Sequence, residues 1–174
     1  MNPPATGRRS AALLLLAGAL LGSGAPVQAK SLKDKLVGAW SLISFEANDT
    51  AGHKVPSIEG SDVKGRLFLT DSGLLSVQII ADYPKLASKD RLKTTPAENE
   101  AVAHGVLCFF GTYTVDAISK QIVFYIERSS FPNQATGKGF ARRVTLTGDQ
   151  LRLDSPGQAV GGKQTFVIVW KRMP

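Results

Sequence analysis

The chain has 174 residues, of which 43% are hydrophobic, a formal charge of +7 at pH 7 and a single cysteine. This composition argues against a disordered chain, and one cysteine cannot close an internal disulfide, which excludes a disulfide-stapled scaffold. The basic residues are scattered and no nucleic-acid-binding motif is present, so we expect no nucleic-acid partner.

The first 29 residues have the three zones of a secretory signal peptide. Arg8 and Arg9 form a basic region, the apolar run 11–21 is shorter than the roughly 18 residues of a membrane span, and Val27-Gln28-Ala29 resembles a cleavage site. We expect cleavage after Ala29, export to the periplasm or the medium, and no stable membrane insertion afterwards. The alternative is an N-terminal segment that is disordered or forms a buried helix. Residues 30–174 keep a formal charge of +5 and suffice for one domain.

The expected domain begins with a helical turn over residues 32–37. This turn leads through Gly38 into a strand that contains Trp40. In small up-and-down β-barrels such a turn closes one end, the glycine permits a tight bend, and the indole covers the floor of the core. We interpret Trp40 as this floor residue, and contact between its ring and a ligand is the alternative.

Turn-forming residues divide the rest of the chain into short strands. Asp71-Ser72-Gly73 separates the strands of a hairpin, because aspartate starts turns and glycine adopts positive φ. A helix is expected from Thr95 to about Cys108, since Thr95, Pro96 and Glu98 form a strong capping sequence. The expected strands cover residues 39–47, 54–58 (weak, interrupted by a proline), 64–70, 74–81, 111–116, 121–129, 140–147, 151–154 and 163–171.

About eight strands at this spacing predict an all-β fold, a closed antiparallel up-and-down barrel with a short N-terminal helical turn and one inserted helix. Closure removes exposed sheet edges, and eight strands is the number at which a barrel can hold one small ligand. We interpret the polar segment 82–94 as a lid over this barrel. Cys108 is interpreted as a buried, inert thiol on the inserted helix.

One strand places a charge among apolar residues. Alternation over residues 140–147 puts Arg142 on the apolar face, which we expect to point inward. A charge in that position needs a partner or a ligand. The candidate partners are Glu127 and a phenol from Tyr113 or Tyr125. Both faces of the strand 121–129 are apolar, so the sequence leaves open which of its residues point inward.

Several segments match a known pattern in order and spacing. They begin with Leu36-Val37-Gly38-Ala39-Trp40-Ser41-Leu42 and continue with residues 64–67, 70–73, 76–78, 87–91, 95–99, 110–113, 130–133, 142–143 and 148–153. Together they resemble the lipocalin-like domain family, small bacterial and fungal proteins similar to the calycins, over residues 33–172. The resemblance implies a calycin-like barrel with a cavity and no general activity.

The chain departs from this family at two places. Relatives often carry histidines where this chain has Phe124-Tyr125, and a tryptophan where it has Gln134. Chemistry that depends on those histidines is therefore not expected here.

Two functions follow as hypotheses. The first is an exported binding protein for a small apolar ligand, with Arg142 and a tyrosine holding an acidic or carbonyl head group. The second is a cofactor-free isomerase, cyclase or lyase with Glu127 or Asp90 as the base. No pair of acidic residues has a suggestive spacing, which favours the binding protein. A barrel filled by its own side chains is a third possibility.

The candidate ligand-binding residues are Trp40, Gln78, Tyr113, Tyr125, Glu127 and Arg142. We expect no cofactor and no metal, because the two histidines, His53 and His104, have no metal-ligand spacing. The sequence leaves the catalytic residues, the identity of the ligand and the oligomeric state open.

Overall fold

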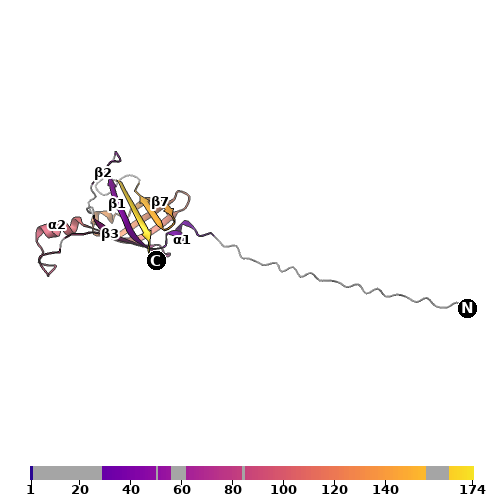
Figure 1. The fold of residues 1–174 in the computed structure, drawn as a ribbon, viewed down its shortest axis with the longest axis horizontal. Helices are drawn as coiled ribbons and strands as arrows, with labels where there is room; N and C mark the ends of the chain where they lie inside the picture. The colour runs from indigo at the N-terminus through magenta and orange to yellow at the C-terminus, as the bar shows by residue number, and fades with distance from the viewer. Residues whose placement is uncertain (2–28, 50, 56–61, 84, 156–164) are drawn as a thin grey trace.

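The computed structural model describes residues 1, 29–49, 51–55, 62–83, 85–155 and 165–174. The expected signal peptide therefore lies almost entirely outside the described residues. Within them, the elements in chain order are α1 (Leu32–Leu36), β1 (Gly38–Asn48), β2 (Lys54–Val55), β3 (Val63–Leu69), β4 (Leu74–Ala81), α2 (Pro96–His104), β5 (Val106–Asp116), β6 (Gln121–Ser129), the 3-10 helix η1 (Pro132–Gln134), β7 (Gly139–Thr147), β8 (Gln150–Asp154) and β9 (Thr165–Arg172) (Figure 1).

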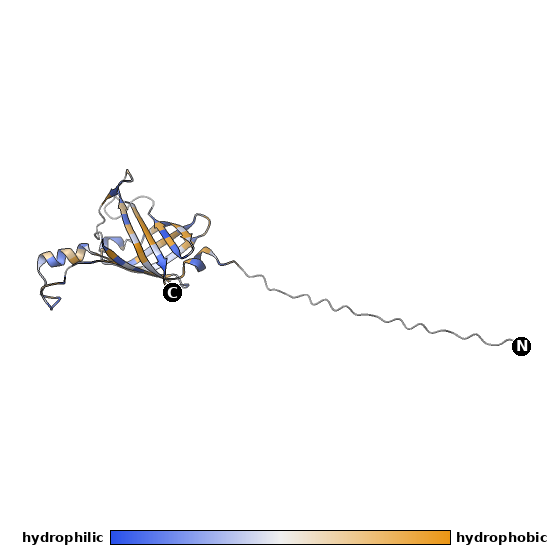
Figure 2. Ribbon diagram, viewed as in Figure 1, coloured by the Kyte–Doolittle hydropathy of each residue, from blue (hydrophilic) through white to orange (hydrophobic). Residues whose placement is uncertain are grey.

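The strands form a closed antiparallel barrel, as the sequence predicts. Strands β1 and β3 to β9 follow one another around the sheet, and the pairing of β1 with β9 closes it. That pairing runs from Trp40 opposite Arg172 to Asn48 opposite Thr165. The short strand β2 is an addition that pairs only with the end of β1. Apolar and polar residues alternate along the strands (Figure 2), so one face of each strand forms the interior.

The two ends of the barrel differ. The tight turns after β3, β5 and β7 lie at the same end as α1 and the end of β9, because successive strands are antiparallel. We call this the closed end. The connections after β1, β4 and β6 lie at the opposite end, which we call the open end. The connection after β6 contains η1, and the one after β4 contains α2.

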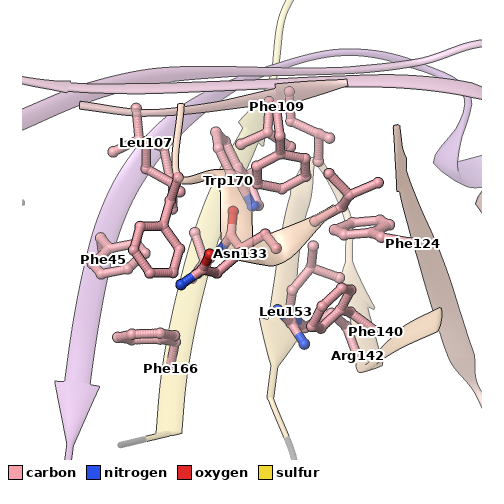
Figure 3. Close-up of a pocket in the computed structure, with 17 residues that line it drawn as sticks. Phe45, Leu107, Phe109, Phe124, Asn133, Phe140, Arg142, Leu153, Phe166 and Trp170 are labelled. Carbon is pink, nitrogen blue, oxygen red and sulfur yellow. The ribbon is translucent and has the colours of Figure 1, made fainter. Parts of the chain in front are cut away.

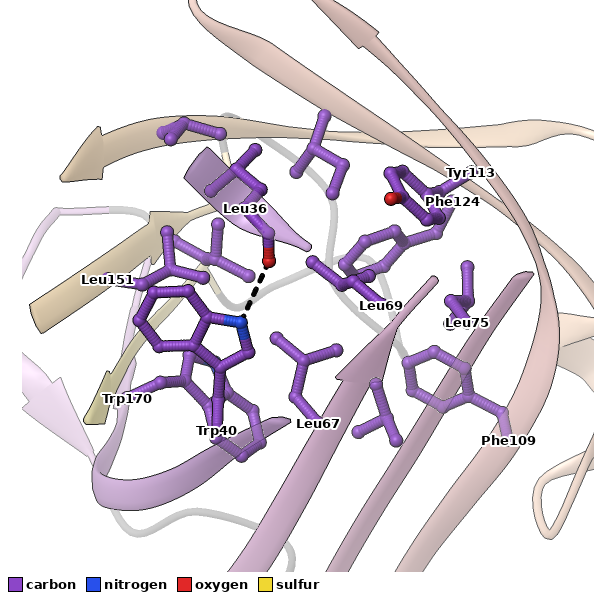
Figure 4. Packing of buried hydrophobic residues seen from close by; sticks show 14 of the residues in the cluster. Leu36, Trp40, Leu67, Leu69, Leu75, Phe109, Tyr113, Phe124, Leu151 and Trp170 are labelled. Atoms are coloured by element: carbon purple, nitrogen blue, oxygen red, sulfur yellow. Dashed lines mark hydrogen bonds between the residues drawn. The ribbon is translucent and has the colours of Figure 1, made fainter. Parts of the chain in front are cut away.

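The closed end is filled by α1 and Trp40 (Figure 4). Ser31 and Asp34 form a capping box that starts α1. Leu36 and Trp40 are completely buried, and the indole N–H of Trp40 donates a 2.9 Å hydrogen bond to the carbonyl of Leu36. The guanidinium carbon of Arg172 lies 4.1 Å from the centre of the Trp40 ring, and Arg172 also donates to the carbonyl of Val37. Trp40 is thus the floor residue that the sequence predicts.

Gly38 is required at the junction of α1 and β1. Its φ of +135° is one that other residues rarely adopt, and a Cβ there would lie 2.7 Å from Nη1 of Arg172. We expect Gly38→Ala to lower the free energy of unfolding by about 2–3 kcal/mol, because backbone strain adds to the displacement of Arg172. Urea unfolding followed by circular dichroism measures this loss.

Gly52→Ala is the matched control. Gly52 also has a positive φ, +88°, but a Cβ there would meet nothing within 4 Å. We expect this variant to lose only about 1 kcal/mol, from backbone strain alone. Equal losses in the two variants would show that the contact with Arg172 contributes nothing.

The inserted helix is shorter than the sequence predicts. α2 ends at His104, the amide of Gly105 donates to the carbonyl of Ala101, and β5 begins at Val106. The prediction of a helix to Cys108 is wrong because the run 105–110 pairs with β4, where Val106 lies opposite Ile80. A short apolar run fits a helix or a strand equally well, so its pattern alone could not decide.

Cys108 therefore lies on a strand. Its neighbours Leu107 and Phe109 point into the barrel, which places Cys108 on the outer face, half-buried. Burial raises the pKa of its thiol, so the thiolate is disfavoured at neutral pH, in keeping with an unreactive cysteine.

Other strand limits differ by a few residues. The weak strand predicted over 54–58 is observed as Lys54–Val55, and residues 56–58 lie outside the described residues. The closing strand is observed from Thr165, and residues 163–164 also lie outside them. β1 begins at Gly38 and ends at Asn48, which extends the prediction by one residue at each end.

Residues 82–83 and 85–105 form an arm that projects from the open end (Figure 1). Its helix α2 has no buried residue, and Leu92 is 87% exposed. The arm is held by its own hydrogen bonds: the Glu98 carboxylate accepts from the backbone amides of Ala87 and Thr95 at 2.7 and 2.8 Å. These bonds lower the pKa of Glu98.

Candidate ligand-binding cavity

A cavity of about 420 Å³ occupies the barrel between the floor and η1 (Figure 3). This volume lies within the range of about 300–1,000 Å³ that is typical of small-molecule sites. Every strand of the closed barrel contributes to its wall. The lining residues are Phe45, Leu67, Val77, Ile79, Leu107, Phe109, Phe124, Ile126, Phe131, Asn133, Gln134, Phe140, Arg142, Leu153, Phe166, Ile168 and Trp170.

The wall is aromatic. Six of the eight phenylalanines of the chain line the cavity, together with Trp170. The rings of Phe45 and Phe166 are tilted by 38° with centroids 5.0 Å apart, and those of Phe109 and Phe124 are tilted by 51° at 6.2 Å. Such tilted pairs present both ring faces and ring edges to the cavity.

Arg142 brings a positive charge into this apolar wall. It lies on β7 opposite Ile122, and its Nη1 donates a 3.0 Å hydrogen bond to the carbonyl of Ala141. Among the described residues, no carboxylate comes within 4.0 Å of its guanidinium. Burial lowers the pKa of Arg142 from its ordinary value to about 10, so the side chain is still charged at neutral pH.

Three further polar side chains line the cavity. Gln134 is buried in η1, and its side-chain oxygen accepts a 2.8 Å hydrogen bond from the hydroxyl of Ser129. Asn133 precedes it in the same helical turn. Trp170 is only 1% exposed, and its indole N–H has no partner among the described residues. None of the 17 lining residues is an aspartate, glutamate or histidine. Arg142 is therefore the one charged side chain among these 17 residues.

The structure brings only one of the six predicted site residues to the cavity. Arg142 lines it, as expected. Trp40 lies below it in the floor, and Tyr113 lies near the closed end, where its hydroxyl donates a 2.5 Å hydrogen bond to the carbonyl of Thr70. Burial raises the pKa of Tyr113, and its hydroxyl is already engaged, so neither aromatic residue presents a polar group to the cavity.

The other three predicted residues lie on the outside of the barrel. Gln78 and Glu127 are exposed, and Tyr125 is 39% exposed. On β6 it is Ile122, Phe124 and Ile126 that are buried, which answers the question that the sequence left open. None of these three residues lines the cavity, and no ion pair between Glu127 and Arg142 is found among the described residues.

Sequence reasoning missed Trp170 and the η1 residues. Alternation in the closing strand places Phe166, Ile168 and Trp170 on one face, and this signal could have identified the indole. Asn133 and Gln134 lie in a connection without periodicity, where the sequence indicates only a bend. Their position depends on how β6 and β7 are joined across the open end.

The lid expected over residues 82–94 is not observed. No described residue of the arm lines the cavity, whereas three residues of the segment 131–134 do. We expect that saturation with 2-naphthoate, a flat aromatic acid, slows amide hydrogen exchange in 131–135 and leaves 86–104 unchanged, because only the first segment contacts the cavity. Exchange measured by mass spectrometry, with and without the acid, tests this, and slowing in the arm alone would contradict it.

Other chemistry finds little support in the described part of the chain. No group of three or more His, Cys, Asp or Glu side chains there is close enough to hold a metal ion. The side chain of His53 is 80% exposed and lies 3.2 Å from Asp49. None of the helices in the described ranges is long and apolar enough to cross a membrane.

The fold and the cavity define a small closed β-barrel of the kind that binds ligands in its interior. A family model described as a lipocalin-like domain matches residues 37–173, and the chain belongs to this family. No curated protein matches the chain. Among solved structures, the chain is similar to a redesigned beta barrel with 12% sequence identity and a TM-score of 0.42, over 83% of this chain and 100% of the other.

Proposed function

We propose that this protein is an exported binding protein that holds an apolar aromatic acid in its barrel. The observation that carries the proposal is Arg142, a charged side chain in a mainly apolar cavity with no carboxylate partner among the described residues. A carboxylate on the ligand would be that partner.

The energetics of Arg142 support a ligand anion. A partly buried charge without a partner is unfavourable, and desolvation lowers the pKa of Arg142 to about 10. A carboxylate would make charge-assisted, two-point hydrogen bonds with the planar guanidinium. Part of the desolvation cost already present in the free protein would thereby be recovered on binding.

The aromatic wall supports an aromatic body for the ligand. Six phenylalanines and Trp170 surround the space in which the body of the ligand would lie. Removal of the apolar surface of the ligand from water would drive binding at about 25 cal/mol per Å². A flat aromatic body fits this wall by offset and edge-to-face contacts.

Export is the second part of the proposal. The basic, apolar and small-residue zones of the first 29 residues support it. The intact mass of the protein recovered from its own cells tests it. A chain beginning at Lys30 is expected, and an intact Met1 terminus on the functional protein would contradict export.

No observation favours the catalytic alternative. The bases considered for a cofactor-free isomerase, cyclase or lyase were Glu127 and Asp90. Glu127 is exposed on the outside of the barrel, and Asp90 lies on the arm, where it pairs with Lys93 at 3.7 Å. Neither lines the cavity.

A pair of matched ligands tests the binding function. Calorimetric titration at pH 7 would compare 2-naphthoate with 2-naphthamide, which has the same ring system and no charge. We expect the acid to bind about 10- to 100-fold more tightly, which is the range for hydrogen bonds to a charged group. Equal affinities, or tighter binding of the amide, would contradict the proposal.

A further inference from the structure

The two tryptophans of this chain differ in how their indole N–H groups are satisfied. Both are almost completely buried, at 0% and 1% exposure. Trp40 donates to the carbonyl of Leu36, whereas the N–H of Trp170 has no partner in the described part of the chain. Leaving a buried donor unpaired costs about 1–3 kcal/mol, and buried polar groups in folded proteins are rarely left so.

The indole nitrogen of Trp170 is buried in the wall of the cavity. Trp170 lies on β9, on the same inward face as Phe166 and Ile168, and it lines the cavity (Figure 3). An N–H group can only donate, so its natural complement is a carbonyl, ether or hydroxyl oxygen. The residues around it are mainly apolar, and a ligand atom is therefore the group that could satisfy it.

The indole and the guanidinium lie in different parts of the cavity. The strand register places Trp170 opposite Leu151 on β8, and Leu151 opposite Leu146 on β7. Leu146 is four residues along β7 from Arg142, which is about 13 Å of strand. Figure 3 accordingly shows Trp170 and Arg142 at separate positions in the wall. One carboxylate held by Arg142 would leave the indole N–H for another atom of the ligand.

We infer that the ligand carries a second hydrogen-bond acceptor, remote from its carboxylate, that binds the indole N–H of Trp170. This inference rests on the proposed function, because it takes the carboxylate at Arg142 as the first anchor. The ligand class is then narrower than an aromatic acid. It is an aromatic acid with a carbonyl or ether oxygen at the far side of its ring system.

Matched compounds and one substitution test this inference. The first pair is 4′-acetylbiphenyl-4-carboxylate and its 4′-isopropenyl analogue, which has nearly the same shape and no acceptor. The second, shorter pair is 6-acetyl- and 6-isopropenyl-2-naphthoate. Trp170→Phe keeps an aromatic wall and removes the N–H. We expect it to weaken the acetyl compound of at least one pair about five-fold more than its isopropenyl analogue.

A second measurement uses the unaltered protein. In two-dimensional ¹H–¹⁵N NMR spectra, the indole N–H resonance of Trp170 is expected to move further downfield with the acetyl compound than with its analogue. The resonance of Trp40 serves as the internal reference, since its hydrogen bond to Leu36 lies outside the cavity. This NMR measurement does not depend on the folding of any variant.

The two proposals fail in different ways. If Trp170→Phe weakens both members of each pair equally and the Trp170 resonance does not distinguish them, the inference is overturned, although the preference for acid over amide would still stand. If the biphenyl and naphthalene acids bind no better than their amides, the first anchor is wrong and the proposed function fails.

Discussion

Replacing Arg142 by leucine is expected to stabilise the empty protein. The substitution removes a partly buried cation that has no ion-pair partner among the described residues and fills its place with apolar atoms. Exchanges of buried charge for apolar side chains are often neutral or stabilising by about 1–4 kcal/mol. We therefore expect the free energy of unfolding at pH 7 to rise by about 1–3 kcal/mol, measured by urea unfolding.

The pH dependence of this gain has a definite sign. Burial lowers the pKa of Arg142 in the folded protein to about 10, so above this pH the unfolded chain, in which the arginine keeps its ordinary higher pKa, binds more protons. The cost of the buried charge is fully present below pH 9 and is relieved as the pH rises through 10. The advantage of the leucine variant is accordingly expected in full at pH 7 and to shrink above pH 10.

The same substitution is expected to abolish the preference for acids. Affinity for 2-naphthoate should fall by about 10- to 100-fold, while affinity for 2-naphthamide should change little, because only the acid uses the guanidinium charge. Arg143→Leu is the matched control. Arg143 is the next residue on β7 and is exposed, so its loss should leave both affinities nearly unchanged. If Arg142→Leu lowered the affinities for the acid and the amide equally, or lowered neither, Arg142 would not be the residue that selects acids.

Trp40→Ala is expected to cause the largest loss of stability. The side chain is completely buried, its N–H is bonded to Leu36, and Arg172 stacks on its ring. Truncation of a buried aromatic residue costs about 3–5 kcal/mol, from lost burial and the cavity left behind. Urea unfolding measures it, with Leu92→Ala as the control.

Leu92 is 87% exposed on the arm, so its substitution should change the free energy of unfolding by no more than about 0.5 kcal/mol. A loss below about 1 kcal/mol for Trp40→Ala would contradict its role as the floor of the barrel. Such a result would also mean that residues other than Trp40 form the base of the cavity.

The barrel itself could be predicted from the sequence because its signals are local. Turn residues such as Gly73, which has a φ of +89°, mark the strand ends, and strict alternation over 140–147 places Arg142 inside. The Gly38–Trp40 junction was recognisable for the same reason, since a tight bend and a large ring occur at a fixed spacing. These features depend on neighbouring residues and need no knowledge of the sheet.

The features that the sequence could not predict depend on contacts between distant parts of the chain. Cys108 is on a strand because β4 pairs with the run 105–110, which the helix-capping sequence before it does not reveal. Both faces of β6 are apolar, so Tyr125 could be placed only once the barrel was closed. The cover over the cavity comes from η1, whose position is set by the join between β6 and β7 rather than by any pattern of its own.

The ionisation of a bound acid tests the central claim most directly. With 2-naphthoate labelled with ¹³C at the carboxyl carbon, NMR follows the titration of that group while it is bound. If Arg142 holds it, the pKa of the bound acid should lie clearly below that of the free acid, which is near 4, as expected for a carboxylate beside a cation. A bound pKa equal to or above the free value would place the carboxylate away from the guanidinium and contradict the account.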